Sequence, residues 1–180
     1  TAAAFGGFNR INFGGHREID VTPLTISTEK MRNLQDHLML FFTGFSRNAS
    51  DIAQKQIEIT SSKTKELDFM VELCKEAEEL LVSSENGFLE WGELLNEQWK
   101  VKKSMTNLIT NSKIDEIYAE GIRSGALGGK LLGAGGGGFM LFLVPPEKQE
   151  QVKINLNTIL HVPFKFDFSG SQIVYYNKND

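Results

Sequence analysis

The chain has 180 residues and a mass of 20.1 kDa, which suits one domain or two small ones. Apolar residues make up 41% and charged residues 23% of the sequence, proportions that are typical of a globular protein and exclude wholesale disorder. Nineteen basic and 23 acidic side chains leave a net charge of −4. This balance argues against a nucleic-acid partner, because phosphate affinity needs clustered Lys and Arg.

Sequence signals for a membrane, a disulfide or a metal are weak. The uncharged run 131–146 is interrupted by five glycines and falls short of the ~20 apolar residues of a spanning helix. No signal peptide is visible, and the single cysteine, Cys74, cannot form an internal disulfide, so we expect a cytoplasmic protein without a membrane partner. The histidines lie far apart and show no zinc-site spacing, so no metal ligands are assigned.

The first part of the chain predicts a hairpin, a helix and a buried strand. Residues 8–13 and 17–24 alternate apolar and polar side chains across a glycine turn, which favours a β-hairpin. Ser27 or Thr28 can cap a short helix that runs through Leu34. The run 38–42 is apolar at every position and therefore predicts a strand buried on both faces.

Four helices are predicted next, and then mainly strands. The helices begin near Ser50, near Leu67, at Phe88 and at a Ser112 cap, and the second places Cys74 on its apolar stripe. A glycine-dense stretch, 125–138, leads into a buried strand at 139–144. Pro145-Pro146 starts another helix, and strands are expected at 164–168 and 173–176. The pattern predicts an α+β fold in which an antiparallel sheet is backed by helices.

The glycines at 133, 135 and 138 satisfy the G-x-G-x-x-G spacing of dinucleotide-binding loops, but their context does not. That motif needs a strand before it and a helix after it. Here we expect a helix before the loop and a strand after it. A Walker A loop is also excluded, because no Gly-Lys-Ser/Thr follows.

The run Gly135–Gly138 nevertheless points to a ligand. Without Cβ atoms the backbone can adopt positive φ and can approach another group closely, and successive N–H groups can form a concavity for an anion. The alternative is a tight turn against a helix. Seven glycines among residues 128–138 favour a loop beside a ligand. Lys130 is a candidate phosphate contact, with a solvated lysine as the alternative.

A second candidate site follows the buried strand at 38–42. Thr43, Ser46 and Arg47 lie where the chain enters a helix, and hydroxyls, N–H groups and a guanidinium at such a place suit a sugar phosphate. Simple N-capping by Ser46 or Ser50, with Arg47 in solvent, explains the same residues equally well. Both interpretations stay open at this stage.

The segment Lys130–Phe139 resembles the third motif of the galactokinase, homoserine kinase, mevalonate kinase and phosphomevalonate kinase (GHMP) superfamily. Segments 2–11, 42–47 and 166–172 resemble the D-glycero-D-manno-heptose 7-phosphate kinases, so the resemblance spans nearly the whole chain. It implies a ferredoxin-like antiparallel sheet backed by helices. It also implies ATP-dependent phosphorylation of the anomeric hydroxyl of a heptose 7-phosphate, a step toward nucleotide-heptose. The implied nucleotide-binding residues are Gly133, Gly135, Gly136, Gly137 and Gly138, and the implied substrate-binding residues are Thr43, Ser46, Arg47 and Lys130.

The sequence lacks other parts of that family's pattern. The first motif and the phosphate-gripping second motif are absent, and the catalytic aspartate would fall upstream of Thr1. We therefore expect the C-terminal half of a kinase. Residues 27–180 would form its C-terminal domain, and residues 1–26 a hairpin that completes the N-terminal domain. ATP and Mg²⁺ would be held mainly by the other half, and this chain alone would be inactive.

Two alternatives remain open. One is a non-catalytic ligand-binding or regulatory module with a ferredoxin-like sheet, whose glycine loop holds an anion without chemistry. The other is a different GHMP sugar kinase, such as a fucose kinase, which shares the reaction but has another acceptor.

Overall fold

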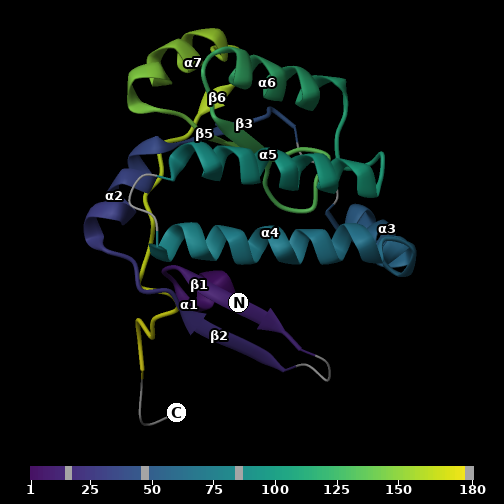
Figure 1. Ribbon diagram of the computed structural model, residues 1–180, viewed down its shortest axis with the longest axis vertical. Helices are drawn as coiled ribbons and strands as arrows, with labels where there is room; N and C mark the ends of the chain where they lie inside the picture. Colours follow the sequence, from purple (N-terminus) through teal and green to yellow (C-terminus); the bar gives the residue numbers. More distant parts are fainter. Residues whose placement is uncertain (15–17, 46–48, 84–86, 177–180) are drawn as a thin grey trace.

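A computed structural model describes residues 1–14, 18–45, 49–83 and 87–176. At one end of the molecule a small sheet is covered by two helices, α6 and α7, and at the opposite end lies a separate β-hairpin, β1–β2 (Figure 1). The long helices α4 and α5 run side by side between these two parts.

The sheet has four strands in the order β4-β5-β3-β6, and every pair of neighbours is antiparallel. Helices separate β3 from β4, and α7 separates β5 from β6, which makes a βαββαβ unit with the strand order of a ferredoxin-like fold. The predicted antiparallel sheet is therefore confirmed. The elements are β3 (Leu38–Phe42), α6 (Ser112–Arg123), β4 (Gly128–Leu131), β5 (Phe139–Leu143), η3 (Pro146–Lys148), α7 (Gln149–Asn155) and β6 (Leu160–His161).

The two faces of the sheet are covered differently. Met39, Phe41 and Phe142 project from one face into the main core, where they meet residues of α6, α7 and the fully buried Trp99 of α5. Leu38 and Leu143 project from the opposite face into a second, smaller cluster with residues of α2, α4 and α5. Alternate residues of one strand thus enter two separate cores, which is why the run 38–42 is apolar throughout.

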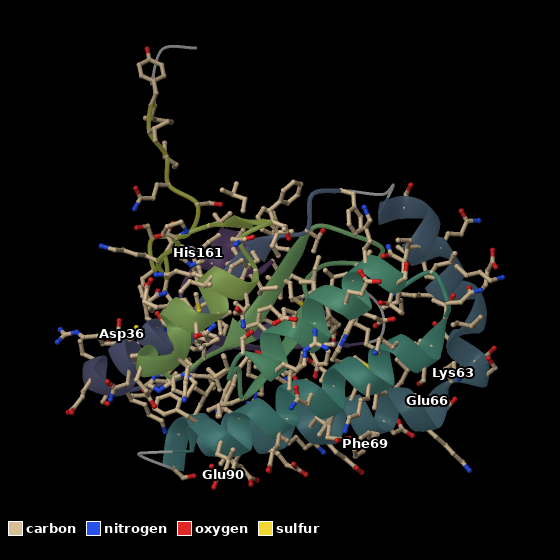
Figure 2. All side chains as sticks on the ribbon, turned by 90° about the horizontal axis from the view of Figure 1, so that it is seen from above. Asp36, Lys63, Glu66, Phe69, Glu90 and His161 are labelled. Atoms are coloured by element: carbon tan, nitrogen blue, oxygen red, sulfur yellow. The ribbon has the colours of Figure 1, made fainter. Side chains whose placement is uncertain are left out.

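The helices follow the predicted pattern with two corrections. They are α2 (Thr28–His37), α3 (Ala49–Ile59), η2 (Thr60–Ser62), α4 (Thr64–Ser83) and α5 (Phe88–Met105). Ser27 caps α2 as expected, but α6 is capped by Asn111, whose side chain accepts from the Ile114 N–H at 3.1 Å. Cys74, which the sequence places on the apolar stripe of α4, is exposed, because the buried face of α4 contains Leu73 instead. The ion pair of Lys63 and Glu66 lies at the beginning of α4 (Figure 2).

The hairpin is formed by β1 (Asn9–Phe13) and β2 (Ile19–Pro23), with Ile11 opposite Val21, as the alternation predicted. It follows a one-turn helix, α1 (Ala2–Phe5). Its contact with the rest of the molecule includes an ion pair between Arg10 and Glu78 of α4 at 3.3 Å. A single exposed pair of this kind contributes little stability, so the hairpin is held mainly through Phe8 and its neighbours.

The two strands predicted at the C-terminal end were wrong. Residues 164–168 are extended but pair with no strand, because the Gln35 side chain bonds both Phe164 O and Phe166 N, at 3.2 and 2.8 Å. A further backbone group of this segment bonds to the N-terminal part of the chain, because Gly7 N donates to Asp167 O at 2.8 Å. Residues 173–176 are between 76% and 96% exposed and contact no sheet edge. Alternation alone cannot distinguish such segments from strands.

Several glycines of the dense stretch serve helix–strand packing. A Cβ on Gly128 would lie 2.0 Å from the carbonyl oxygen of Gly92 in α5, so α5 and β4 touch backbone to backbone. Gly128 and Gly129 belong to β4, and therefore a strand precedes the glycine loop where a helix had been predicted. The exclusion of the dinucleotide motif stands, because β5 and not a helix follows.

Gly128→Ala should lower the free energy of unfolding by at least about 2 kcal/mol, because neither backbone can yield without separating α5 from β4. Gly14→Ala is the matched control, since its nearest neighbour would lie at an ordinary 3.4 Å. Denaturant titration of both variants measures the difference. Equal stability of the two would show that the backbone contact is not tight.

Candidate functional site

The glycine loop, defined here as residues 132–138, connects β4 to β5 as the turn of a hairpin. Its glycines adopt positive φ, a conformation that is strained for side chains with a Cβ atom. The values are 74° at Gly133, 118° at Gly135, 74° at Gly136, 156° at Gly137 and 104° at Gly138. The backbone conformation of this loop therefore depends on glycine along most of its length.

The end of β3 clasps the end of this loop. Thr43 is only 3% exposed, and its hydroxyl donates to Gly138 O at 2.9 Å and accepts from Gly138 N at 3.1 Å. Gly138 N also lies 2.9 Å from Phe45 O, and a Cβ on Gly137 would lie 2.6 Å from the same oxygen. Thr43, a residue of the second predicted site, thus contacts Gly138 of the glycine loop directly.

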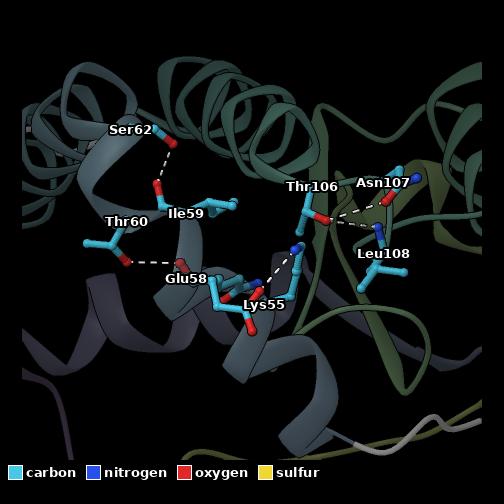
Figure 3. A network of polar contacts seen from close by, with 9 residues as sticks. Lys55, Glu58, Ile59, Thr60, Ser62, Thr106, Asn107 and Leu108 are labelled. Carbon is cyan, nitrogen blue, oxygen red and sulfur yellow. Dashed lines mark hydrogen bonds and ion pairs between the residues drawn. The ribbon is translucent and has the colours of Figure 1, made fainter.

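The middle of the loop rests on Ile109. Gly136 N donates to Ile109 O at 2.8 Å, and a Cβ on Gly135 would lie 2.9 Å from the Ile109 Cα. Ile109 is held by a turn in which the Thr106 hydroxyl accepts from Leu108 N at 3.4 Å (Figure 3). Close packing therefore explains some of the glycines. This agrees in part with the alternative prediction, in which the glycines form a tight turn.

Lys130, the predicted phosphate contact, lies in β4, and its amine donates to the Gln98 side chain of α5. Burial lowers the pKa of the Lys130 amine. Its role as a phosphate contact stays a prediction.

Lys102 of α5 contacts the glycine loop and is absent from the residues predicted from the sequence. Its amine donates to Gly133 O at 2.5 Å and lies 3.4 Å from Leu131 O, at the beginning of the glycine loop. Burial, with a smaller contribution from the charge of Lys130, lowers the pKa of Lys102 to about 8. No sequence signal singles it out, because it belongs to a lysine-rich helix end that resembles a solvated face.

An open groove of about 730 Å³ begins at Thr43 and extends between α6 and residues 155–160. Four charged side chains of α6 line it, namely Lys113, Glu116, Glu120 and Arg123. A hydrogen bond from Arg123 lowers the pKa of the Glu120 carboxyl. The groove thus offers polar groups of both signs for a small polar molecule. Ser46 and Arg47, two of the predicted substrate contacts, lie outside the described residues.

The described residues show neither a cluster of metal ligands nor a membrane-spanning helix. Among residues 1–14, 18–45, 49–83 and 87–176, no group of three His, Cys, Asp or Glu side chains could hold a metal ion. Within the same ranges, no helix has both the length and the apolar character needed to cross a bilayer.

Residues 70–158 match the family described as GHMP kinases C terminal. The chain carries a GHMP kinase C-terminal domain. The resemblance stated from the sequence is thereby confirmed, together with the α+β fold.

Relatives of this GHMP domain act on several acceptors. A D-glycero-alpha-D-manno-heptose 7-phosphate kinase of Campylobacter jejuni is 34% identical over 82% of the chain and 44% of that protein. A bifunctional fucokinase/GDP-fucose pyrophosphorylase of Arabidopsis thaliana is 30% identical over 77% of the chain and 13% of that protein. A heptose 1-phosphate kinase structure from Bacteroides thetaiotaomicron shares the fold, with a TM-score of 0.66 at 24% identity over 96% of the chain and 47% of that structure. The chain spans less than half the length of each.

Thr43→Val should lower the free energy of unfolding by about 0.5–1.5 kcal/mol, because it removes the hydrogen bonds of the hydroxyl to Gly138, whose carbonyl and N–H keep the Thr43 N–H and Phe45 O as partners. Thr43→Ser keeps the hydroxyl and is the control. Denaturant titration compares the two variants. A Val variant as stable as the Ser variant would show that the clasp contributes nothing.

The half-buried amine of Lys102 should make stability depend on pH. Because its folded pKa is about 8 and its ordinary value 10.5, the unfolded chain binds more protons between these values, and stability rises with pH in that window. The unfolding free energy of the wild type, relative to Lys102→Met, should increase by about 1–2 kcal/mol from pH 7.5 to 9.5. Paired denaturant titrations at the two pH values measure it. A constant difference would show that Lys102 titrates normally.

Proposed function

We propose that this chain forms one wall of the active site of an ATP-dependent sugar or sugar-phosphate kinase. The observation that carries the proposal is that Thr43 and Phe45, which line the groove, also hydrogen-bond to Gly138 of the family's glycine motif. Phosphoryl transfer depends on fixed positions for phosphate oxygens, and a loop held from three sides supplies such positions.

The acceptor we propose is D-glycero-D-manno-heptose 7-phosphate. The support is the 34% identity to the Campylobacter jejuni enzyme, together with the segments at 2–11, 42–47 and 166–172. In the reaction the anomeric oxygen forms a bond to the γ-phosphorus of ATP, the bond to the β-γ bridging oxygen breaks, ADP leaves, and the hydroxyl proton passes to a base. The product would feed nucleotide-heptose synthesis in the cytoplasm.

The remaining machinery belongs, in this proposal, to the N-terminal half of the same kinase. That half would supply the catalytic aspartate and most contacts to ATP and Mg²⁺, so the present chain alone would be inactive. Residues 1–26 would add their hairpin to it. The hairpin supports this assignment because Phe13 and Ile19 stand directly opposite each other and are 72% and 51% exposed. Such a pair is unfavourable in water and is suited to a covering surface.

The test is a kinase assay on the protein made from its complete reading frame, with heptose 7-phosphate, fucose and mevalonate as acceptors. We expect ATP-dependent turnover with heptose 7-phosphate at a kcat/KM at least about tenfold above the others, the factor that roughly one lost hydrogen bond produces. Gly137→Val, which would collide with Phe45 O, should abolish that turnover. The 180-residue chain should show none.

Higher activity with fucose would support the proposed kinase activity but contradict heptose 7-phosphate as the acceptor. Anion binding without turnover on any acceptor would contradict the kinase and favour a non-catalytic module.

A further inference from the structure

Two side chains hold the glycine loop by its carbonyl oxygens. Lys102 of α5 donates to Gly133 O at 2.5 Å, and Gln56 of α3 donates to Ala134 O at 3.0 Å. Both residues line one pocket of about 340 Å³ between α3, α4 and α5, so they reach the loop from the same side. The carbonyl groups of Gly133 and Ala134 thereby point toward helices α5 and α3.

The peptide geometry then fixes the opposite edge of the loop. In a trans peptide the C=O of one residue and the N–H of the next point in opposite directions, and no described peptide bond is cis. Fixing Gly133 O therefore aims the Ala134 N–H away from Lys102, and fixing Ala134 O aims the Gly135 N–H away from Gln56.

The loop's N–H groups divide into two kinds. Those of Gly136 and Gly138 are occupied, by Ile109 O and by Phe45 O with the Thr43 hydroxyl. Those of Gly133, Ala134, Gly135 and Gly137 donate to no acceptor within the described residues, although Gly135 is buried. Buried N–H groups nearly always have an acceptor. Among these unoccupied donors, the N–H groups of Ala134 and Gly135 are the two whose direction Lys102 and Gln56 fix.

We propose that Lys102 and Gln56 are positioning residues, which aim the N–H groups of Ala134 and Gly135 at a phosphate oxygen. The inference rests on the proposed function and names the atoms that would meet the phosphate. The oxygen belongs either to ATP or to the sugar phosphate.

The charge of Lys102 adds to this arrangement. The ion pairs among the described residues involve neither Lys102 nor Lys130. Lys130 of β4 is the charged group that acts on Lys102, while the side chains of α3 and α4 that line the pocket beside it are uncharged. An anion on the far edge of the loop would balance both cations through the intervening peptide dipoles.

The first test is an NMR titration of the protein from its complete reading frame, labelled with ¹⁵N-alanine and ¹⁵N-glycine. Tripolyphosphate stands in for ATP, and mannose 6-phosphate for the sugar phosphate. We expect one probe to shift the Ala134 and Gly135 amides at least about twofold more than those of Gly136 and Gly138, since direct hydrogen bonds to charge are the stronger perturbation. Equal shifts along the loop, or none, would overturn the inference. Loop binding without kinase activity would overturn the proposed function alone.

The second test compares kinetic constants of variants in that protein. Lys102→Met should raise KM about tenfold for the substrate whose phosphate meets the loop and leave the other KM within about twofold. Gln56→Met should act in the same direction. Lys102→Arg has space in the adjoining pocket and should restore the wild-type value. Lys100→Met, an exposed position on the same helix paired with Glu97, is the control and should change nothing.

The dependence on pH separates positioning from a structural role. The wild type should lose phosphate affinity above about pH 8, where Lys102 becomes neutral, and Lys102→Arg should not, because a guanidinium stays charged. Equal pH profiles for the two, or equal rises in both KM values, would show that Lys102 serves only to stabilise the fold.

Discussion

The structure depends on the close approach of backbone to backbone around the glycine loop. Gly137 and Gly138 lie against the carbonyl of Phe45, Gly135 lies against Ile109, and the Thr43 hydroxyl fills the remaining gap. The contacts of Gly135 and Gly137 need the absence of a Cβ atom, so these two glycines serve packing and conformation together. The loop is consequently held by close contacts on several sides, although its sequence looks like that of a flexible linker.

The same constraint recurs at the other end of β4. Gly92 and Gly128 allow helix α5 to touch the strand, and Gly121 allows α6 to lie against the ring of Phe142. Because α5 is set so close, Lys102 on its last turns reaches Gly133 O with its full side chain. The position of a cation at the loop is therefore a result of packing about three turns away on the same helix.

The periodicity of the sequence predicted most of the fold, and its glycine content predicted part of the candidate site. The hairpin, the buried strand 38–42 and the long helices follow from alternation and three-and-four spacing, and the strand order agrees with the resemblance. The segments 164–168 and 173–176 were misassigned because alternation reports one covered face and not a hydrogen-bonded neighbour. Lys102 and Gln56 could not be found, because their contacts with the loop cross 31 and 78 positions of sequence.

The strand β4 has neighbours of two kinds, β5 along one edge and helix α5 across its face. A helix that touches a strand without intervening side chains cannot slide or roll independently of it. Residues 92 and 128 should therefore vary together among related sequences. A larger side chain at either position would require helix α5 to move away from β4. The conformation of the glycine loop is in this way tied to the distance between α5 and β4, although α5 contributes no residue to the loop.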